Sequence, residues 1–223
     1  MFFHLADRAV GAYIDPVQSI NINRAGCRMQ VLKESDKRIY EVVNSLLEMG
    51  GTFIFPTDTV YGIGGGPWDE RALAQVRRMK GRREAQPFTL HLPSIEAIER
   101  FADVDERIRR ILSDFLPGPI TFIIPASDGA PPATVLDGKV GIRVPEHMFF
   151  QSVMFALNRP LFGTSVNRSG EEPLASIDMM IEQFSGVDLL VEGQIGTGIP
   201  SAIIDLTSDP PHALRGELPQ DLR

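Results

Sequence analysis

Along the chain, segments whose apolar residues follow the period of an α-helix alternate with short β-prone segments, and this alternation predicts the class of the fold. One helix face shows i, i+3, i+4, i+7, i+8 spacing in its apolar residues, which are Ile39, Val42, Val43, Leu46 and Leu47. Ser35 ahead of this face predicts the N-cap of the helix, and Gly50-Gly51 behind it predict the end. A short β-prone run at residues 52–56 follows, where the period changes from helix to strand.

The same two patterns continue through the rest of the sequence. They predict further helices at residues 69–79, 94–101, 104–115, 150–157 and 176–184. They predict further strands at residues 27–31, 88–92, 120–124, 140–144, 161–165, 187–192, 202–207 and 212–215. Because strands and helices alternate, the predicted class is α/β with a mixed sheet.

The first part of the chain differs from the rest. Residues 1–26 show no clean period, so we expect a loosely structured arm there. With the first strand, this arm makes a segment of residues 1–32, and a short tail covers residues 219–223. Residues 33–218 contain no linker-like stretch and no repeat, which predicts one domain.

Composition and charge exclude several classes of protein. A hydrophobic fraction of 43% with 23% charged residues excludes a disordered chain. The one cysteine, Cys27, excludes an intrachain disulfide and a cysteine-based zinc site, and it favours a reducing compartment. The net charge of −7 disfavours a protein that coats nucleic acid. No apolar run approaches the roughly 18 residues of a membrane helix, so a cytoplasmic protein without a membrane contact is expected.

The familiar phosphate, metal and nucleophile motifs are missing from the sequence. There is no G-x-x-x-x-G-K-S/T, no G-x-G-x-x-G, no H-E-x-x-H and no G-x-S-x-G. The four histidines, at positions 4, 91, 147 and 212, are scattered, and no resident metal site is predicted. Any phosphate chemistry must therefore use another kind of site.

Two segments carry unusual polar chemistry. Residues 56–64 follow an apolar strand and combine hydroxyls with glycines, which fits either a ligand loop or a turn that satisfies its own backbone. The segment Arg71–Arg83 holds six cations and no acid. The helix dipole favours cations near a helix end, but six uncompensated charges more readily serve an anion such as a polyphosphate or a nucleic-acid backbone.

Single polar residues also interrupt the predicted strands. Alternation places His91 on the same strand face as Thr89, and Arg143 interrupts an apolar strand. A buried arginine needs a partner, which is either a structural acid or a ligand carboxylate. Polar loops follow at residues 163–170 and 200–205, with Arg215 further along the chain.

In this order, the segments resemble the YrdC-domain family, the threonylcarbamoyl-AMP synthases of tRNA modification. Residues 56–64 match the family's first motif without a change, and Lys80-Gly81-Arg82 with Pro87 and His91 follow the second. The later motifs stand at residues 117–121, 141–145, 163–170, 200–205 and Arg215. The resemblance covers residues 35–218 and implies one α/β domain, with a mixed twisted sheet, flanking helices and a concave basic cleft.

The resemblance also implies the reaction and the residues that serve it. L-threonine, bicarbonate or CO2, and ATP with Mg²⁺ would give threonylcarbamoyl-AMP and pyrophosphate for the tRNA nucleoside N6-threonylcarbamoyladenosine. The implied catalytic residues are Lys80 and Arg82, which we expect at the surface, so that their removal affects the nucleotide rather than folding. The implied ATP contacts are Lys80, Arg82, Gln86, Ser165, Asn167 and Arg215. The implied threonine contacts are Thr59, Tyr61, His91, Arg143 and Ser201.

Departures from the family pattern keep two alternatives open. Arg83, Gln86, Phe88, Ala202 and Gly216 stand where the family has Pro, Asn, Leu, Thr and Pro. One alternative is a YrdC-like paralogue with another carbamoyl or acyl-adenylate substrate. The other is an RNA-binding module that uses the Arg71–Arg83 cluster for tRNA or double-stranded RNA. A synthase would also need a downstream tRNA-modification partner that consumes its product.

Overall fold

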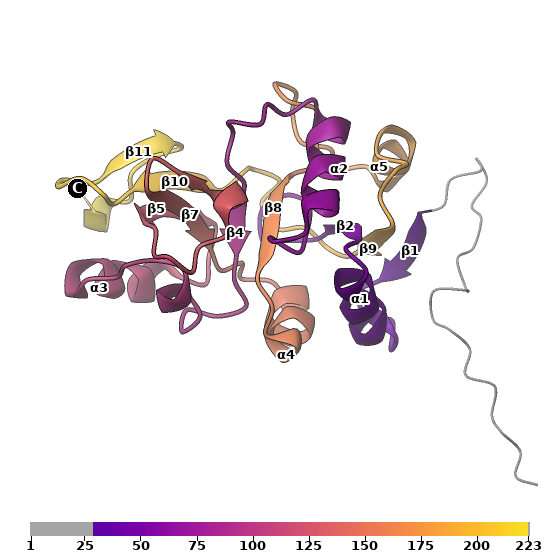
Figure 1. Cartoon of the computed structure of the whole chain (residues 1–223), viewed down its shortest axis with the longest axis horizontal. Helices are drawn as coiled ribbons and strands as arrows, with labels where there is room; N and C mark the ends of the chain where they lie inside the picture. Colours follow the sequence, from indigo (N-terminus) through magenta and orange to yellow (C-terminus); the bar gives the residue numbers. More distant parts are fainter. Residues whose placement is uncertain (1–28, 223) are drawn as a thin grey trace, which may run out of the picture.

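The computed structural model describes residues 29–222, so the predicted arm at 1–26 and Cys27 lie outside the described residues. In the described part, the strands form one mixed sheet that runs through the middle of the molecule, with helices on both sides (Figure 1). The strand order is β1-β9-β2-β3-β8-β4-β7-β5-β10-β11, and β6 pairs with β7. This arrangement confirms the predicted class.

The strands of this sheet are β1 (Gln30–Lys33), β2 (Thr52–Phe55), β3 (Gly62–Gly65), β4 (Thr89–His91), β5 (Ile120–Pro125), β6 (Val135–Leu136), β7 (Lys139–Arg143), β8 (Leu161–Ser165), β9 (Leu189–Glu192), β10 (Ala202–Asp205) and β11 (His212–Arg215). Four neighbouring pairs are parallel, namely β1–β9, β2–β9, β4–β7 and β5–β10. The remaining neighbours are antiparallel. Because β1 pairs with β9, the strand that the sequence groups with the arm is an edge strand of the sheet.

The helices are α1 (Ile39–Glu48), α2 (Glu70–Lys80), α3 (Glu106–Phe115), α4 (Phe155–Leu157) and α5 (Ile177–Gln183). A π-helical segment, η4 (Phe150–Met154), leads directly into α4. Side chains cap three of the helices, since Asp69, Asp105 and Ser176 each accept a hydrogen bond from a backbone N–H in the first turn. Gly81 ends α2 with a left-handed φ of 63°.

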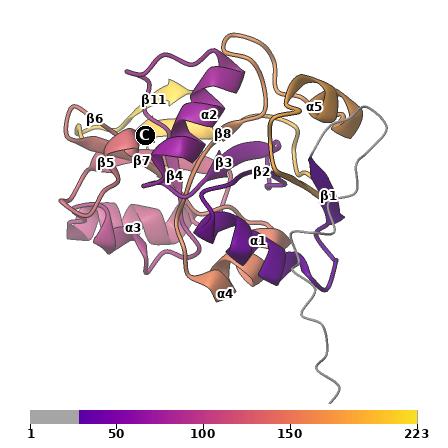
Figure 2. The same cartoon turned by 45° about the vertical axis from the view of Figure 1, so that its right-hand side comes forward.

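Strand alternation divides the β1–β8 half of the sheet into two buried faces. Phe53 and Phe55 point to one face, where they pack with α1 and η4. Ile54 points to the other face, where it packs with α2 and α5. Figure 2 shows the same division, with α1 and α4 on one side of the strands and α2 and α5 on the other.

The other half of the sheet, β4 to β10, has only one face covered by a helix. Leu90, Phe122, Ile142 and Ile204 point toward α3 and are all fully buried. Their neighbours in sequence point to the opposite side, where none of the α-helices of the described residues packs. The uncovered face of these strands is where the site described below lies.

Several predicted elements differ from the structure. Ser35 does not cap α1, because the helix starts at Ile39 and Asp36 instead accepts hydrogen bonds from Arg38. The helix predicted at 94–101 is only a 3-10 turn at Ile98–Arg100. Strands β3 and β6 were not among the predicted elements. Asp137-Gly138 joins β6 to β7 with φ of 50° and 72°, a turn that glycine at the second position suits.

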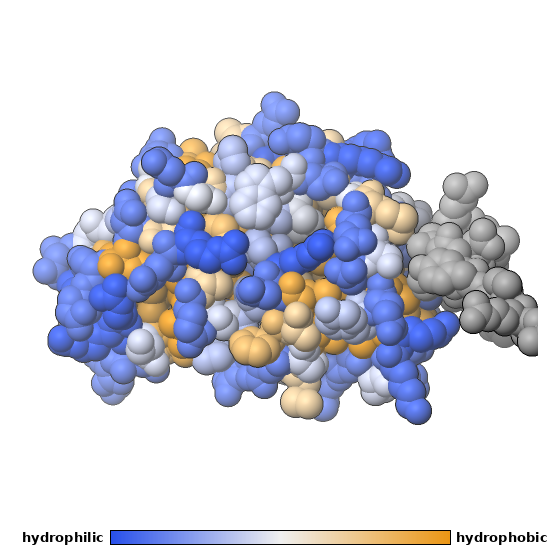
Figure 3. Space-filling view, turned by 60° about the horizontal axis from the view of Figure 1, so that its bottom comes forward, coloured by the Kyte–Doolittle hydropathy of each residue, from blue (hydrophilic) through white to orange (hydrophobic). Residues whose placement is uncertain are grey.

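None of the helices in the described residues has both the length and the apolar character needed to cross a membrane. On the face that Figure 3 shows, apolar areas are separated from one another by charged and polar side chains.

Candidate active site

A cavity of about 440 Å³ opens on the uncovered face of the sheet. Its floor consists of the strand residues that alternate with the α3-facing core, among them Thr89, His91, Thr121, Gly141 and Arg143. Loops and strands far apart in the sequence supply its walls, at residues 57–62, 82–88, 134–139 and 200–215. A cavity of this size suits a small-molecule ligand.

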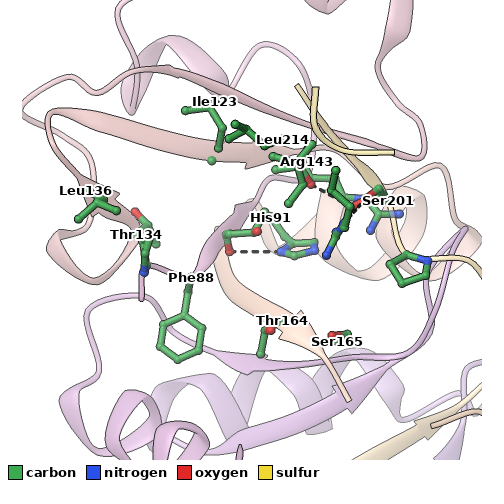
Figure 4. A pocket seen from close by; sticks show the side chains of 18 of the residues that line it. Phe88, His91, Ile123, Thr134, Leu136, Arg143, Thr164, Ser165, Ser201 and Leu214 are labelled. Carbon is green, nitrogen blue, oxygen red and sulfur yellow. Dashed lines mark hydrogen bonds between the residues drawn. The ribbon is translucent and has the colours of Figure 1, made fainter. Parts of the chain in front are cut away.

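Most of the residues predicted for the site meet in this cavity. Seven of them line it, namely Tyr61, Arg82, His91, Arg143, Ser165, Ser201 and Arg215. His91 and Arg143 are register partners on neighbouring parallel strands, so their side chains share one face of the sheet. Figure 4 shows Arg143, His91 and Ser201 grouped at one end of the cavity, with Thr134 and Leu136 at the other. The structure therefore brings these seven residues together in one cavity, and their roles toward a ligand stay predictions.

Four predicted residues do not line the cavity. They are Thr59, Lys80, Gln86 and Asn167. The Asn167 amide oxygen accepts from Ser165 Oγ and from Lys80 Nζ, and its NH2 group donates to the carbonyls of Arg168 and Glu171. Thr59 is buried and contacts Arg143 instead. The roles of these four residues as ligand contacts stay predictions.

Arg143 has a structural acid as its partner. Its Nη2 donates to Asp58 Oδ1 at 2.6 Å and to Thr59 Oγ1 at 2.8 Å. Burial, the largest influence, lowers the pKa of the Arg143 guanidinium, whereas the Asp58 carboxylate raises it. The Arg143 Nε and the Asp58 Oδ2 are buried without a hydrogen-bond partner. The side chain lines the cavity with part of its donor capacity unused.

The loop at residues 57–61 is fixed by contacts with residues 193–198. Backbone N–H groups of Gly196, Thr197 and Gly198 donate to the carbonyls of residues 57, 58 and 59. The Tyr61 hydroxyl donates to the carbonyl of Gly193. Burial raises the pKa of this hydroxyl above its usual value, so Tyr61 serves as a neutral wall of the cavity.

Ser201 and Arg215 form the part of the wall next to Arg143. Arg215 Nε donates to the Ser201 carbonyl at 2.9 Å, and its Nη2 donates to Ser201 Oγ at 3.3 Å. Ser201 Oγ also lies 3.1 Å from Thr121 Oγ1. The last contact joins Thr121 and Ser201, which are 80 residues apart in the sequence, in the same part of the wall.

His91 is a buried, neutral ring. Its residue is 5% exposed, and its ring packs edge-on against Phe55 at a centroid distance of 5.9 Å. Burial, together with the positive charge of Arg143, lowers the pKa of His91 to about 3. A side chain on Gly163 would collide with the His91 ring, since a Cβ there would lie 2.7 Å from it.

The buried ring makes stability dependent on pH. The unfolded chain binds a proton on His91 near pH 6.5, whereas the folded chain binds it only near pH 3. Stability is therefore lost as pH falls from about 6.5 toward 3. We expect His91→Asn to flatten this part of the curve of unfolding free energy against pH, measured by urea titration.

The control for this experiment is His212→Asn, which removes an exposed imidazole from the edge strand β11. It should keep the acid-side slope of the unmodified protein. Parallel curves for His91→Asn and the unmodified protein between pH 6.5 and 3 would contradict the assignment of this slope to His91.

Lys80 is not a surface cation, and that expectation is wrong. The residue is 3% exposed, and its Nζ donates to the carbonyls of Ser165 and Asn167 and to Asn167 Oδ1. Burial, with a smaller effect from the charge of Arg82, lowers the pKa of Lys80 to about 7. Lys80 therefore holds the 165–167 loop in place, and its amine does not reach the cavity lining.

The sequence-based prediction missed an ion pair in the cavity wall. Lys139 Nζ lies 3.1 Å from Asp205 Oδ2, and both residues line the cavity. Thr207 donates to the other carboxylate oxygen from its N–H and hydroxyl. Only a weak signal for this pair is present in the sequence. Asp205 ends the polar loop at residues 200–205, and Lys139 directly precedes the strand predicted at 140–144.

Together, the fold and the cavity define a class of protein. It is a single mixed-sheet α/β domain whose cavity places Arg82, Lys139, Arg143 and Arg215 around hydroxyl groups. Only Asp137 and Asp205 bring carboxylates to the same lining. Such a lining suits an anionic small molecule.

Comparisons with known proteins place this domain in a family. The family model Sua5/YciO/YrdC, described as "Telomere recombination", matches residues 45–216. The chain belongs to this family.

Individual relatives agree with this assignment. A threonylcarbamoyl-AMP synthase of Dichelobacter nodosus is 34% identical over 70% of this chain and 84% of its own length. One from Pyrococcus abyssi is 32% identical over 80% of this chain and 54% of its own length. The chain thus spans about half the length of the Pyrococcus relative.

Solved structures share the fold. The crystal structure of Pyrococcus abyssi Sua5 complexed with L-threonine has a TM-score of 0.76 and 30% identity, over 84% of this chain and 56% of that one. The crystal structure of Escherichia coli YciO has a TM-score of 0.75 and 25% identity, over 84% of this chain and 93% of that one. The similarity therefore extends over nearly all the described residues.

Proposed function

We propose that this chain is a threonylcarbamoyl-AMP synthase, which makes threonylcarbamoyl-AMP and pyrophosphate from L-threonine, bicarbonate or CO2, and ATP. The observation that carries this proposal is that seven residues predicted for these ligands line one cavity. Support also comes from relatives named as such synthases and from a similar structure complexed with L-threonine. The product serves the tRNA nucleoside N6-threonylcarbamoyladenosine.

Threonine fits the end of the cavity that holds Arg143. The free donors of Arg143 suit the substrate carboxylate, since a guanidinium matches a carboxylate in shape and charge. His91, Ser201 and Tyr61 surround this end and suit the remaining polar groups of the amino acid. Thr59 acts through the guanidinium to which it is hydrogen-bonded.

The triphosphate fits the cationic wall that Arg82 and Arg215 provide, with Ser165 beside it. Lys80 does not contact the triphosphate in this scheme. It donates hydrogen bonds to Asn167 and so holds the 165–167 loop, which carries Ser165, in place. The Gln86 carbonyl accepts a hydrogen bond from Arg82. Two cations at the phosphates stabilise the negative charge that develops on the departing pyrophosphate. No covalent nucleophile on the protein is needed.

The reaction then proceeds in two steps that the cavity positions. The threonine nitrogen attacks the carbon of CO2 and loses a proton, which gives a carbamate. A carbamate oxygen then attacks the α-phosphorus of ATP, and the bond from that phosphorus to pyrophosphate breaks. The protein contributes positioning and electrostatic stabilisation.

Mg²⁺ fits this scheme as a companion of ATP. It prefers oxygen ligands and usually binds through phosphates, water and one or two carboxylates. Asp137 and Asp205 bring carboxylates to the cavity lining. When bound, the ion would neutralise part of the phosphate charge.

A second surface supports a contact with RNA. Arg71, Arg78 and Arg83 are exposed on α2 and just beyond it, and none of them has an ion-pair partner in the described residues. We infer that this cluster contacts tRNA, and that a downstream tRNA-modification partner in the same cytoplasmic compartment takes up the product. Binding through such a cluster weakens steeply with salt concentration.

The decisive test is pyrophosphate release. We expect release from ATP and Mg²⁺ to require both L-threonine and bicarbonate, because the carbamate must form before the α-phosphorus is attacked. L-serine should react about 10- to 200-fold less well, the discrimination that one methyl group can supply. A coupled pyrophosphate assay, with each component omitted in turn, measures both expectations.

Two outcomes would overturn the proposed function. Release that does not depend on threonine would favour a paralogue with another carbamoyl or acyl-adenylate substrate. No release, with tight RNA binding at low salt, would favour an RNA-binding module.

A further inference from the structure

Two arginine side chains share one aromatic ring at the edge of the cavity. The guanidinium carbon of Arg77 lies 4.8 Å from the ring centroid of Phe88, and that of Arg82 lies 5.0 Å from it. The face of an aromatic ring attracts cations, so both contacts are favourable cation–π interactions. Phe88 itself is 1% exposed, and its ring packs against Phe162 at 4.7 Å. The ring is therefore a fixed support for both guanidinium groups.

Further contacts restrict Arg82 to this position. Its Nη2 donates to the carbonyl of Pro87, and its Nε donates to the carbonyl of Gln86 at 3.4 Å. The three residues that hold the side chain are thus consecutive, from Gln86 to Phe88. Because Arg82 lines the cavity, this short segment fixes the direction from which a positive charge enters the site.

The pair of cations lacks a counter-ion. Neither Arg77 nor Arg82 forms an ion pair with a carboxylate of the described residues, and Arg77 Nη1 is buried without a hydrogen-bond partner. Burial lowers the pKa of the Arg82 guanidinium, and the charge of Arg77 lowers it further. Two like charges on one ring are thus held at an electrostatic cost that an anion in the cavity would relieve.

We propose that Phe88 is a positioning residue, which holds Arg82 and Arg77 together so that they attract the triphosphate group of ATP. Arg82 meets the phosphates in the cavity, while Arg77 raises the positive potential from outside the lining. Leucine, which the family pattern has at this position, offers no ring quadrupole for either cation. This inference rests on the proposed function for its ligand, but it concerns phosphate binding alone.

Binding of inorganic triphosphate and of ATP, measured by calorimetry without threonine, tests the inference. We expect Phe88→Leu to weaken both about 3- to 30-fold, the range that loss of a cation–π contact supplies. Phe88→Tyr keeps the ring and should bind within about twofold of the unmodified protein. The matched control is Phe184→Leu, which changes an equally buried ring of the same core cluster, whereas the cation–π contacts of both arginines are with Phe88.

A double-mutant cycle separates positioning from a merely structural effect. In an Arg82→Met background, Phe88→Leu should have little further effect on triphosphate binding, because the cation that Phe88 positions is gone. If Phe88→Leu folds poorly, the variant Arg77→Met tests the same inference. It should weaken triphosphate binding, whereas the control Arg110→Met, on the distant helix α3, should not.

The outcomes distinguish this inference from the proposed function. Additive effects of Phe88→Leu and Arg82→Met, equal losses in Phe88→Leu and Phe184→Leu, or no triphosphate binding at all would overturn the inference. A different result is that Phe88→Leu has little effect on triphosphate binding once Arg82 is replaced, while no threonine-dependent pyrophosphate release is found. This result would support the inference and overturn the proposed function.

Discussion

Replacing Lys80 by alanine is expected to lower the melting temperature by about 5–10 °C and to weaken ATP binding at the same time. The amine of Lys80 satisfies two carbonyls and the Asn167 side-chain oxygen, which would lose their donor together. An unsatisfied buried acceptor costs about 1–3 kcal/mol, so the loop at 165–167 would loosen. Since Ser165 lines the cavity, that loosening also disturbs the nucleotide site.

Two further variants test whether the loss of stability arises because Lys80 is buried. Arg82→Ala removes a cation that lines the cavity and is only partly buried, so it should weaken ATP binding with a smaller loss of stability than Lys80→Ala causes. Arg110→Ala, an exposed cation on α3, should change neither quantity. Calorimetry of unfolding and of ATP binding on the three variants measures both. A normal melting temperature for Lys80→Ala would show that the buried contacts do not stabilise the loop.

The buried amine also adds a pH dependence. The pKa of Lys80 is about 7 in the folded protein and near 10.5 in the unfolded chain. Between these values the unfolded chain binds more protons, so this group makes stability rise as pH increases from about 7 to 10.5. Lys80→Met should lack that rise, which urea titrations across this range would detect.

Local patterns predicted most of the fold because they reflect contacts close in sequence. Two of the predicted helices begin at Asp69 and Ser176, and in the structure each of these side chains accepts a backbone hydrogen bond as an N-cap. Helix α3 and strands β5 and β7 match their predicted positions to within two residues. In these segments hydrophobic period, capping and turn residues all favour the same structure.

The elements that were missed depend on distant neighbours. Gly62–Gly65 has the composition of a loop, yet it forms the central strand β3. A Cβ on Gly64 would lie 1.8 Å from the carbonyl oxygen of Phe162 on the next strand. Glycine is needed there because of a chain segment about a hundred residues away. The Asp137-Gly138 turn, by contrast, carries a hairpin signal that the sequence does show.

The sequence identified several residues of the site, but it did not show which groups they contact. The resemblance to the YrdC-domain family brought His91, Arg143 and Ser201 into consideration, and in the structure all three line one cavity. The role of Lys80 depends on its burial, which the sequence does not show. Its amine is enclosed by the carbonyls of Ser165 and Asn167. Sequence also left open whether the partner of Arg143 is an acid or a ligand, and Asp58 is that acid.

Arg143→Ala is expected to lower kcat/KM for threonine about 30- to 1,000-fold, which corresponds to the loss of a charged contact with the substrate carboxylate. It should also reduce stability by about 3–5 kcal/mol, because it leaves Asp58 as an unpaired charge. The side chains of this pair are only 6% and 11% exposed, so solvent does little to screen the loss. A fall in activity by itself would therefore not separate substrate binding from folding.

The double variant Asp58→Asn/Arg143→Met separates the two roles. It removes both charges, so most of the stability lost in Arg143→Ala should return. Threonine-dependent pyrophosphate release should stay as low as in Arg143→Ala, because no guanidinium is left for the substrate carboxylate. Asp58→Asn alone keeps Arg143 charged and should retain threonine dependence. Recovery of threonine-dependent activity in the double variant, measured beside its unfolding free energy, would show that Arg143 serves only as the partner of Asp58.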